Sequence, residues 1–165
     1  MIRDSVFVPF RRSLPAAAAV LVLTFVLTGV ATASQQCRPV FSRVDLAVSA
    51  GPCDSAIGLC AGGVLQGTLN ARSSFVGTGS VPTVDTGATG VVVVTGDNTI
   101  HARGGDLFTK DAIVLATTGD GEFAEIDTIV GGTGVYAGAT GKLTGTGTFA
   151  NGVGAGVLFG EVCWP

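Results

Sequence analysis

The sequence predicts an all-β fold, and three observations lead to that prediction. In residues 34–165, glycine, threonine and valine are abundant, whereas leucine is scarce and no long run of helix-forming residues occurs. Apolar and polar side chains alternate with a period of two in several short stretches, which is typical of half-buried strands. Clusters of glycine, aspartate and asparagine separate these stretches, as turns do between strands.

The first 33 residues have the composition of a secretion signal. Arginines precede an apolar run over residues 16–27, and the small residues Ala31 and Ala33 match a signal-peptidase site. The run is too short for a comfortable membrane span, so a retained anchor is the less favoured alternative. The residues around Arg11-Arg12 match the twin-arginine export motif poorly, which favours the general secretory route. We therefore expect a secreted protein with no membrane attachment after removal of residues 1–33.

Residues 34–165 are expected to form a single domain, since 132 residues can bury a sizeable core. This part carries six basic and eleven acidic side chains, a formal charge of −5. Six scattered cations do not make the basic surface that a nucleic-acid binder needs, so no nucleic-acid partner is expected. A small apolar or neutral molecule is the more suitable partner.

Alternation predicts the strands of the first half in order. In residues 40–49, valines and a leucine lie on one face, and charged or polar side chains lie on the other. A second strand is predicted over 63–72, after the loop 53–60, and a third, short strand over 74–77. The glycine-rich segment 79–90 is expected to be the longest loop and could form a flap at the rim.

The second half supplies the remaining strands. Residues 91–94 and 112–116 are apolar on both faces, which suits strands whose outer surface is also covered, as self-association would do. A turn at Gly96-Asp97-Asn98 is expected to precede a strand over 99–103. The last predicted strands cover 122–130, 142–149 and 156–163. The total is eight or nine strands.

The segment 131–141 is a glycine-rich corner between two predicted strands. Its glycines permit positive φ and close backbone approach, and Tyr136 supplies one large ring to fix the turn. A dinucleotide-binding loop would need a helix directly afterwards, but threonine and glycine alternate there instead. We therefore interpret the corner as structural and expect Gly132 and Gly134 to adopt angles that a Cβ resists. Its glycines are Gly131, Gly132, Gly134, Gly138 and Gly141.

The residues Ile-Val-Gly-Gly-Thr-Gly-Val-Tyr-Ala-Gly-Ala-Thr-Gly at 129–141 resemble the signature of allene oxide cyclase-like and dirigent-like barrels. The resemblance implies a closed eight-stranded antiparallel β-barrel, often trimeric, that holds a small apolar ligand or reactive intermediate in its lumen. Plant dirigent proteins usually carry an arginine where this chain has Thr140. The resemblance also implies a homo-oligomer, in particular a trimer.

All four cysteines lie in residues 34–165, and an even number in a secreted chain favours disulfides. Three pairings are possible. In a closed barrel with an even number of strands, the start of the first strand and the end of the last share one rim. This favours Cys37–Cys163 together with Cys53–Cys60. No Cys-x-x-Cys motif occurs and His101 is the only histidine, so neither a metal nor another cofactor is expected.

Two carboxylates are the candidate catalytic residues. Glu125 and Asp127 share a strand face with Phe123 and Ile129. If this face lines the lumen, desolvation and mutual repulsion would raise a carboxyl pKa and provide a usable acid or base. The alternative is a solvated outer face, which is the usual place for strand carboxylates.

His101 and Arg103 share another face and are candidate ligand-binding residues, with an exposed polar stripe as the alternative. Tyr136 is expected near the rim. Three functions are consistent with these features. The first is a barrel that binds a small apolar molecule and steers an isomerisation, cyclisation or coupling, the second is a ligand carrier without turnover, and the third is a structural module with a filled barrel.

Overall fold

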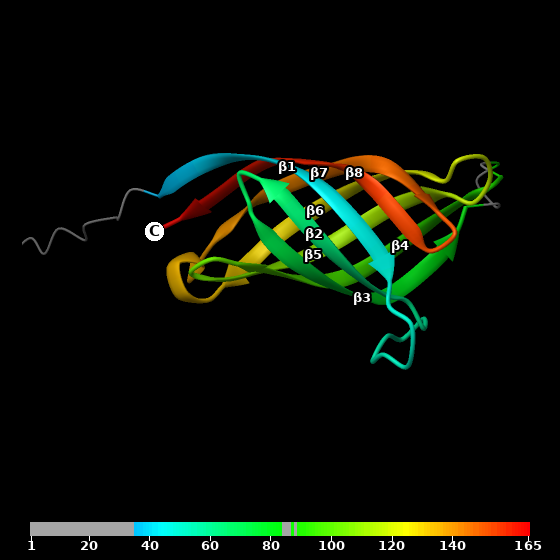
Figure 1. Ribbon diagram of the computed structural model, residues 1–165, viewed down its shortest axis with the longest axis horizontal. Coiled ribbons are helices and arrows are strands. Elements are labelled where there is room, and N and C mark those ends of the chain that lie inside the picture. Colours follow the sequence, from blue (N-terminus) through cyan, green and yellow to red (C-terminus); the bar gives the residue numbers. More distant parts are fainter. Residues whose placement is uncertain (1–34, 84–86, 88) are drawn as a thin grey trace, which may run out of the picture. The chain divides into compact units, whose positions relative to one another are not determined.

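A computed structural model describes residues 35–83, 87 and 89–165, and these residues form a closed barrel of eight antiparallel strands (Figure 1). The predicted fold class is therefore confirmed. The predicted secretion signal lies outside the described residues. Within the described part, no helix is long and apolar enough to cross a bilayer. The elements are β1 (Gln36–Val48), β2 (Cys60–Gly67), β3 (Ala71–Pro82), β4 (Val91–Ala102), β5 (Gly105–Ala116), β6 (Glu122–Gly132), the 3-10 turn η2 (Gly134–Tyr136), β7 (Thr140–Ala150) and β8 (Val153–Trp164).

Each strand pairs with its neighbour in sequence, and β8 returns to pair with β1 from Gln36↔Trp164 to Ala47↔Val153. Consecutive strands run in opposite directions, so the connections between them alternate between the two ends of the barrel. The corner end carries the glycine corner 131–141, the start of β1 and the end of β8. The open end carries the connections 49–59, 117–121 and 151–152, together with the end of β3 and the start of β4.

The corner end is filled by a hydrophobic core. Ile100, Leu107 and Leu143 are fully buried there, and Val162 is almost so. Burial of each such side chain stabilises the fold by roughly 1.5–3 kcal/mol. This core lies between the corner end and the cavity that faces the open end.

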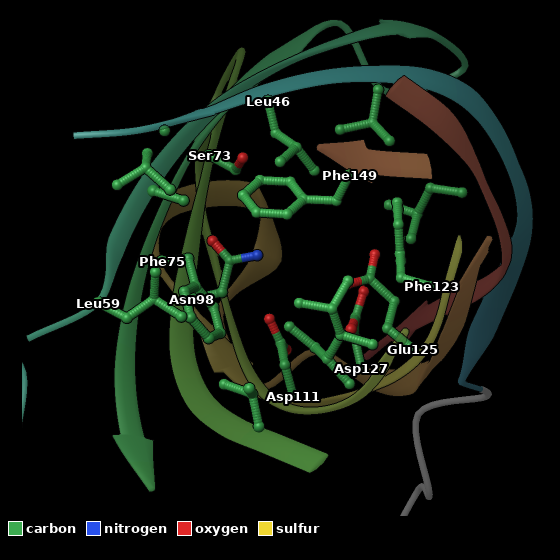
Figure 2. A pocket seen from close by; sticks show the side chains of 18 of the residues that line it. Leu46, Leu59, Ser73, Phe75, Asn98, Asp111, Phe123, Glu125, Asp127 and Phe149 are labelled. Atoms are coloured by element: carbon green, nitrogen blue, oxygen red, sulfur yellow. The ribbon is translucent and has the colours of Figure 1, made fainter. Parts of the chain in front are cut away.

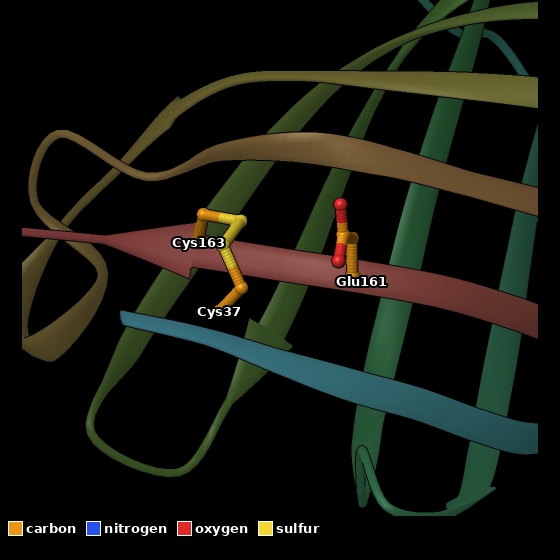
Figure 3. A group of neighbouring side chains, drawn as sticks. All are labelled: Cys37, Glu161 and Cys163. Carbon is orange, nitrogen blue, oxygen red and sulfur yellow. A yellow bond between two sulfur atoms is a disulfide. The ribbon is translucent and has the colours of Figure 1, made fainter. Parts of the chain in front are cut away.

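Both predicted disulfides are present. Cys37 and Cys163 are direct cross-strand partners that join β1 to β8 (Figure 3). The second disulfide, Cys53–Cys60, closes the loop before β2. Glu161 lies beside the first disulfide. Cys37, Glu161 and Cys163 are near enough to share a metal ion, but both sulfurs are bonded to each other and are not thiolates.

Several predicted strand boundaries were wrong. The predicted strand 63–72 spans the turn between β2 and β3, and β3 continues through the first third of the predicted 79–90 loop, to Pro82. The predicted turn at residues 96–98 lies inside β4. Gly96 is there for packing, because a Cβ at this position would collide with the ring of Phe75. The glycine indicated a close side-chain contact, and the chain does not turn.

The glycine corner joins β6 to β7, as predicted. Gly134 has a φ of 57°, as expected for a glycine in the left-handed region. Gly132 was also expected to adopt backbone angles that a Cβ resists, but this expectation was wrong, because its φ is not positive. A Cβ on Gly132 would lie 2.7 Å from the carbonyl oxygen of Tyr136. This glycine is required by close packing of the corner.

The outer wall of the barrel bears exposed apolar side chains. Val114 on β5 and Ile126 and Val130 on β6 are each about half exposed. Phe41 and Phe159 are direct partners on β1 and β8, and both are exposed. These side chains are uncovered in the single chain, so self-association, and the trimer in particular, stays a prediction.

Candidate functional site

A cavity occupies the half of the barrel that faces the open end (Figure 2). The space open to the centre of a water molecule is about 110 Å³, several times the roughly 10–15 Å³ that a single water molecule needs. Its walls are mainly apolar and aromatic. The large apolar side chains that line it include Leu46, Leu65, Phe75, Ile113, Leu115, Phe123, Phe149 and Leu158.

Three carboxyl groups enter this cavity from two neighbouring strands. Asp111 comes from β5, and Glu125 and Asp127 come from β6; together they are called the carboxyl cluster (Figure 2). Asp127 is 2% exposed and Asp111 is 5% exposed. The prediction that Glu125 and Asp127 share a face with Phe123 is confirmed, and the alternative of a solvated outer face was wrong. Along β6, the pair lies between Phe123 toward the open end and the buried Ile129.

Asp111 was missed in the sequence. It lies directly opposite Asp127 in the β5–β6 register, so the two carboxyls meet on the same inner face. Side chains that are direct partners in an antiparallel pair have Cβ atoms about 4.5–5.5 Å apart. A sequence signal was present, since Asp111 alternates with Ile113 and Leu115, but its partner strand and register could not be derived from the residues alone.

Asp127 holds a proton at neutral pH. Burial raises its pKa to about 10, and the negative charges of Glu125 and Asp111 and a hydrogen bond to Asp111 add to the rise. Such a pair of close carboxyls retains a proton because two charges in a medium of low polarity repel strongly. The protonated carboxyl of Asp127 donates to Asp111.

Asp111 is the carboxyl with the most hydrogen-bond support. Burial raises its pKa to about 6, although hydrogen bonds from Thr109, Asn98 and Asp127 lower it. The hydroxyl of Thr109, which is itself buried, donates to Asp111 Oδ1 at 2.5 Å. Because these donors favour the charged form, Asp111 is ionised at neutral pH.

Glu125 lies between these two extremes. Burial raises its pKa to about 7, and the charge of Asp111 contributes to the rise. Its side chain lies across Gly145 of β7, its direct partner, where an added Cβ would come within 2.6 Å of Glu125 Cγ. Gly145 therefore provides the space that Glu125 occupies. Glu125 exchanges its proton near neutral pH, which suits an acid or a base.

Two buried oxygens in the cavity have no hydrogen-bond partner in the described part of the chain. They are Asp127 Oδ1 and Asn98 Oδ1. The Asn98 side chain stabilises the charge of Asp111, which places its amide nitrogen toward Asp111 and leaves its oxygen free. A buried polar atom without a partner costs about 1–3 kcal/mol, so each such atom in a folded protein needs an explanation. Both are acceptors, and both belong to residues that line the cavity.

No positive charge balances the cluster from within the cavity. Among the described residues that line it, none is lysine, arginine or histidine. Lys110, the neighbour of Asp111, lies on the outer face and pairs with Asp97 at 2.6 Å. The cavity therefore has apolar walls, and its hydrogen-bond acceptors are gathered at the end farthest from the open end of the barrel, which is called the deep end.

The other predicted ligand-binding residues lie elsewhere. The His101 side chain is 52% exposed on the outer face of β4, with Nδ1 3.0 Å from Asp106 Oδ1. Arg103 is exposed in the turn between β4 and β5. Tyr136 lies at a rim, as expected, but at the corner end, where its ring meets Trp164 edge to face at 5.9 Å. None of these three lines the cavity that contains the carboxyl cluster.

Comparison of the chain with models of known protein families, with curated proteins and with solved structures finds no match.

Proposed function

We propose that this protein binds a small, mainly apolar molecule inside the barrel and orients it by the carboxyl cluster. The observation that carries the proposal is the combination of apolar walls with an unpartnered, buried carboxyl oxygen at the deep end. Ligand sites commonly have this composition, with a few polar groups in a mostly apolar pocket. The resemblance of residues 129–141 to ligand-holding barrels supports the same function.

The energetic cost of the cluster supports a binding role. Three buried carboxyls without a cation destabilise the empty barrel, and an apolar core at these positions would not. Costs of this kind are concentrated where function requires them. The open cavity favours a binding protein over a structural module whose barrel is filled.

A binding assay with a blocked variant tests this function. We expect a screen of small lipophilic molecules to give saturable binding, measured by calorimetry. Ala61 lines the cavity, so Ala61→Trp should abolish binding by filling it. Ala124 is exposed on β6, and Ala124→Trp is the matched control. Binding that survives Ala61→Trp in a folded protein would contradict a site in the lumen.

A second candidate function is proton-transfer catalysis in the same cavity, such as an isomerisation or cyclisation. One observation favours it, namely that the pKa values of neighbouring carboxyls differ, at about 7 for Glu125 and about 10 for Asp127. Such a pair provides a base and an acid in one site. Glu125 would accept a proton from the ligand, and Asp127 would donate one.

Hydrogen exchange separates the catalyst from the carrier. In D2O, a catalyst should introduce deuterium at a carbon atom of a bound ligand or product, measured by mass spectrometry after the N–H and O–H positions have been exchanged back in H2O. Glu125→Gln should lower that rate by roughly 10²–10⁴-fold while binding stays nearly intact. Glu122→Gln, on the exposed start of β6, is the control. A bound ligand that acquires no carbon-bound deuterium would identify a carrier.

We further propose that the protein is secreted. Its two disulfides are consistent with an extracellular environment. Cleavage after Ala33 would release a chain that begins at Ser34. Intact-mass measurement of the exported protein tests this, and a mass that retains residues 1–33 would reject it.

A further inference from the structure

We infer that the ligand is an organic amine, whose ammonium group is received by the carboxyl cluster and whose apolar body fills the cavity. This inference rests on the proposed function, because it assigns a chemical class to the molecule in the same cavity. It follows from the hydrogen-bonding character, the charge and the spacing of the polar groups at the deep end.

The free hydrogen-bonding positions at the deep end are acceptors. Asp127 Oδ1 and Asn98 Oδ1 are buried and lack partners. The donors that are present are already engaged, since Thr109 donates to Asp111 and the Asn98 amide supports the same carboxylate. A ligand that completes this site must supply hydrogen-bond donors. An ammonium group carries three N–H donors and no acceptor, whereas a hydroxyl carries one donor.

The charge of the site selects the same group. The ionised Asp111 lies inside the barrel, and no described cavity residue is cationic. A buried carboxylate is costly unless a positive charge or a set of donors accompanies it. A ligand ammonium provides both, through charge-assisted hydrogen bonds. A ligand carboxylate would add a further negative charge and would be repelled.

The spacing of the carboxyls favours an organic cation over a metal ion. In the described residues, the only three potential metal-ligand groups that gather within 4.8 Å are those of Cys37, Glu161 and Cys163. The oxygens of Asp111, Glu125 and Asp127 are therefore spread more widely than one metal ion requires. An ammonium group does not need three of these oxygens at once, because one or two charge-assisted hydrogen bonds can hold it.

The side chains that line the cavity determine the part of the ligand other than its ammonium group. From the cluster toward the open end, the ligand would meet the rings of Phe75, Phe123 and Phe149 and the side chains of Ile113 and Leu46. Rings of this kind bury an apolar or aromatic body. The preferred ligand therefore has its amine at one end and a compact apolar group at the other.

Three probes of similar shape test this inference, namely 2-phenylethylamine, 2-phenylethanol and 3-phenylpropionate. We expect the amine to bind about 10- to 100-fold more tightly than the alcohol, from hydrogen bonds to charged acceptors. The propionate should show no binding. Calorimetry at pH 7 on the disulfide-bonded protein measures all three.

Variants locate the preference. Asp111→Asn/Glu125→Gln should reduce the preference for the amine over the alcohol to about threefold or less while leaving alcohol binding unchanged, because it removes the ionised carboxyl of Asp111 and the carboxyl of Glu125 that titrates near pH 7. Asp111→Asn alone should reduce the preference in part, and this single variant is measured if the double variant does not fold. Glu122→Gln should leave the preference intact. A preference that persists in the folded cluster variants would overturn the inference.

The probes also separate this inference from the proposed function. If the alcohol binds as tightly as the amine and Ala61→Trp abolishes both, the lumen binds ligands but the amine class is wrong. If none of the three probes nor any molecule of the lipophilic screen binds, both proposals fail. Amine binding that Ala61→Trp leaves unchanged would place the cation on the outer surface and overturn the inference.

Discussion

Asp111 and Asp127 face each other directly across the β5–β6 ladder, and both side chains are buried inside the barrel. Like charges at directly opposed positions of a sheet are destabilising, and burial strengthens the effect. The pair resolves this conflict by retaining a proton, which Asp127 donates to Asp111. The folded protein therefore binds protons that the unfolded chain releases.

The first prediction concerns the pH dependence of stability. The pKa values of Asp111, Glu125 and Asp127 are raised on folding to about 6, 7 and 10. Between pH 4 and pH 10 the folded state thus holds more protons than the unfolded state, so the free energy of unfolding falls as pH rises. The slope is about 1.4 kcal/mol per pH unit for each retained proton. Urea unfolding at pH 5 and pH 8 should show lower stability at pH 8, and the opposite order would contradict a buried cluster.

The second prediction isolates Asp127. Asp127→Asn keeps the shape but removes a group that ionises only in the unfolded state. We expect this variant to be more stable than the wild type at pH 8, by an amount on the order of 1–3 kcal/mol, with a shallower slope between pH 5 and pH 8. Asp45→Asn, on the exposed face of β1, is the control. An equal loss of stability at both pH values would mean that the hydrogen bond of the carboxyl to Asp111 matters and that its ionisation does not.

Much of this site could be predicted from one strand. Alternation along 122–130 places Phe123, Glu125, Asp127 and Ile129 on one face, because successive side chains of a strand point to opposite sides. It does not say which face is inside. That depends on register with β5 and β7, and a period-two pattern with apolar residues on both faces is consistent with either orientation.

Asp111 and Asn98 show where sequence reasoning failed. Residues 112–116 are apolar on both faces, so the acid just before them was not assigned to the lumen. Asn98 was placed in a turn because glycine and aspartate precede it, whereas Gly96 makes room for Phe75. Both errors have one cause, since contacts between strands decide the role of a residue that local patterns leave open.

The third prediction concerns the disulfides. Cys37 and Cys163 are 126 residues apart and Cys53 and Cys60 only 7. In the chain-entropy account, the longer loop stabilises more, so Cys37→Ser/Cys163→Ser should cost about 4–5 kcal/mol and Cys53→Ser/Cys60→Ser about 2–3 kcal/mol. Denaturant unfolding measures both. Equal losses would show that strain or residual structure outweighs loop length, and a non-reducing peptide map should return these two pairs.

The fourth prediction distinguishes two uses of glycine in the corner. Gly134 has a positive φ, whereas Gly132 is held by contact with Tyr136. Gly134→Val and Gly132→Val should each destabilise by an amount on the order of 1–3 kcal/mol. Gly119 has a φ of 69° and no neighbour within 4 Å, so Gly119→Ala reports backbone strain alone. Unchanged melting of both corner variants would mean that the corner is neither strained nor tightly packed.

The last prediction links packing to the site. Gly145 lies directly beneath the Glu125 side chain, and an added Cβ would come within 2.6 Å of Glu125 Cγ. Gly145→Ala should therefore push Glu125 away from β7 and destabilise the barrel by roughly 1–3 kcal/mol. The carboxyl resonance of Glu125, followed by NMR titration, should report a changed pKa. If the contact is the cause, Glu125→Ala should relieve the cost, so that Gly145→Ala is nearly neutral in that background. If Gly145→Ala lowers the free energy of unfolding equally in both backgrounds, the effect comes from the β7 backbone. Other neighbours would then determine the position of Glu125.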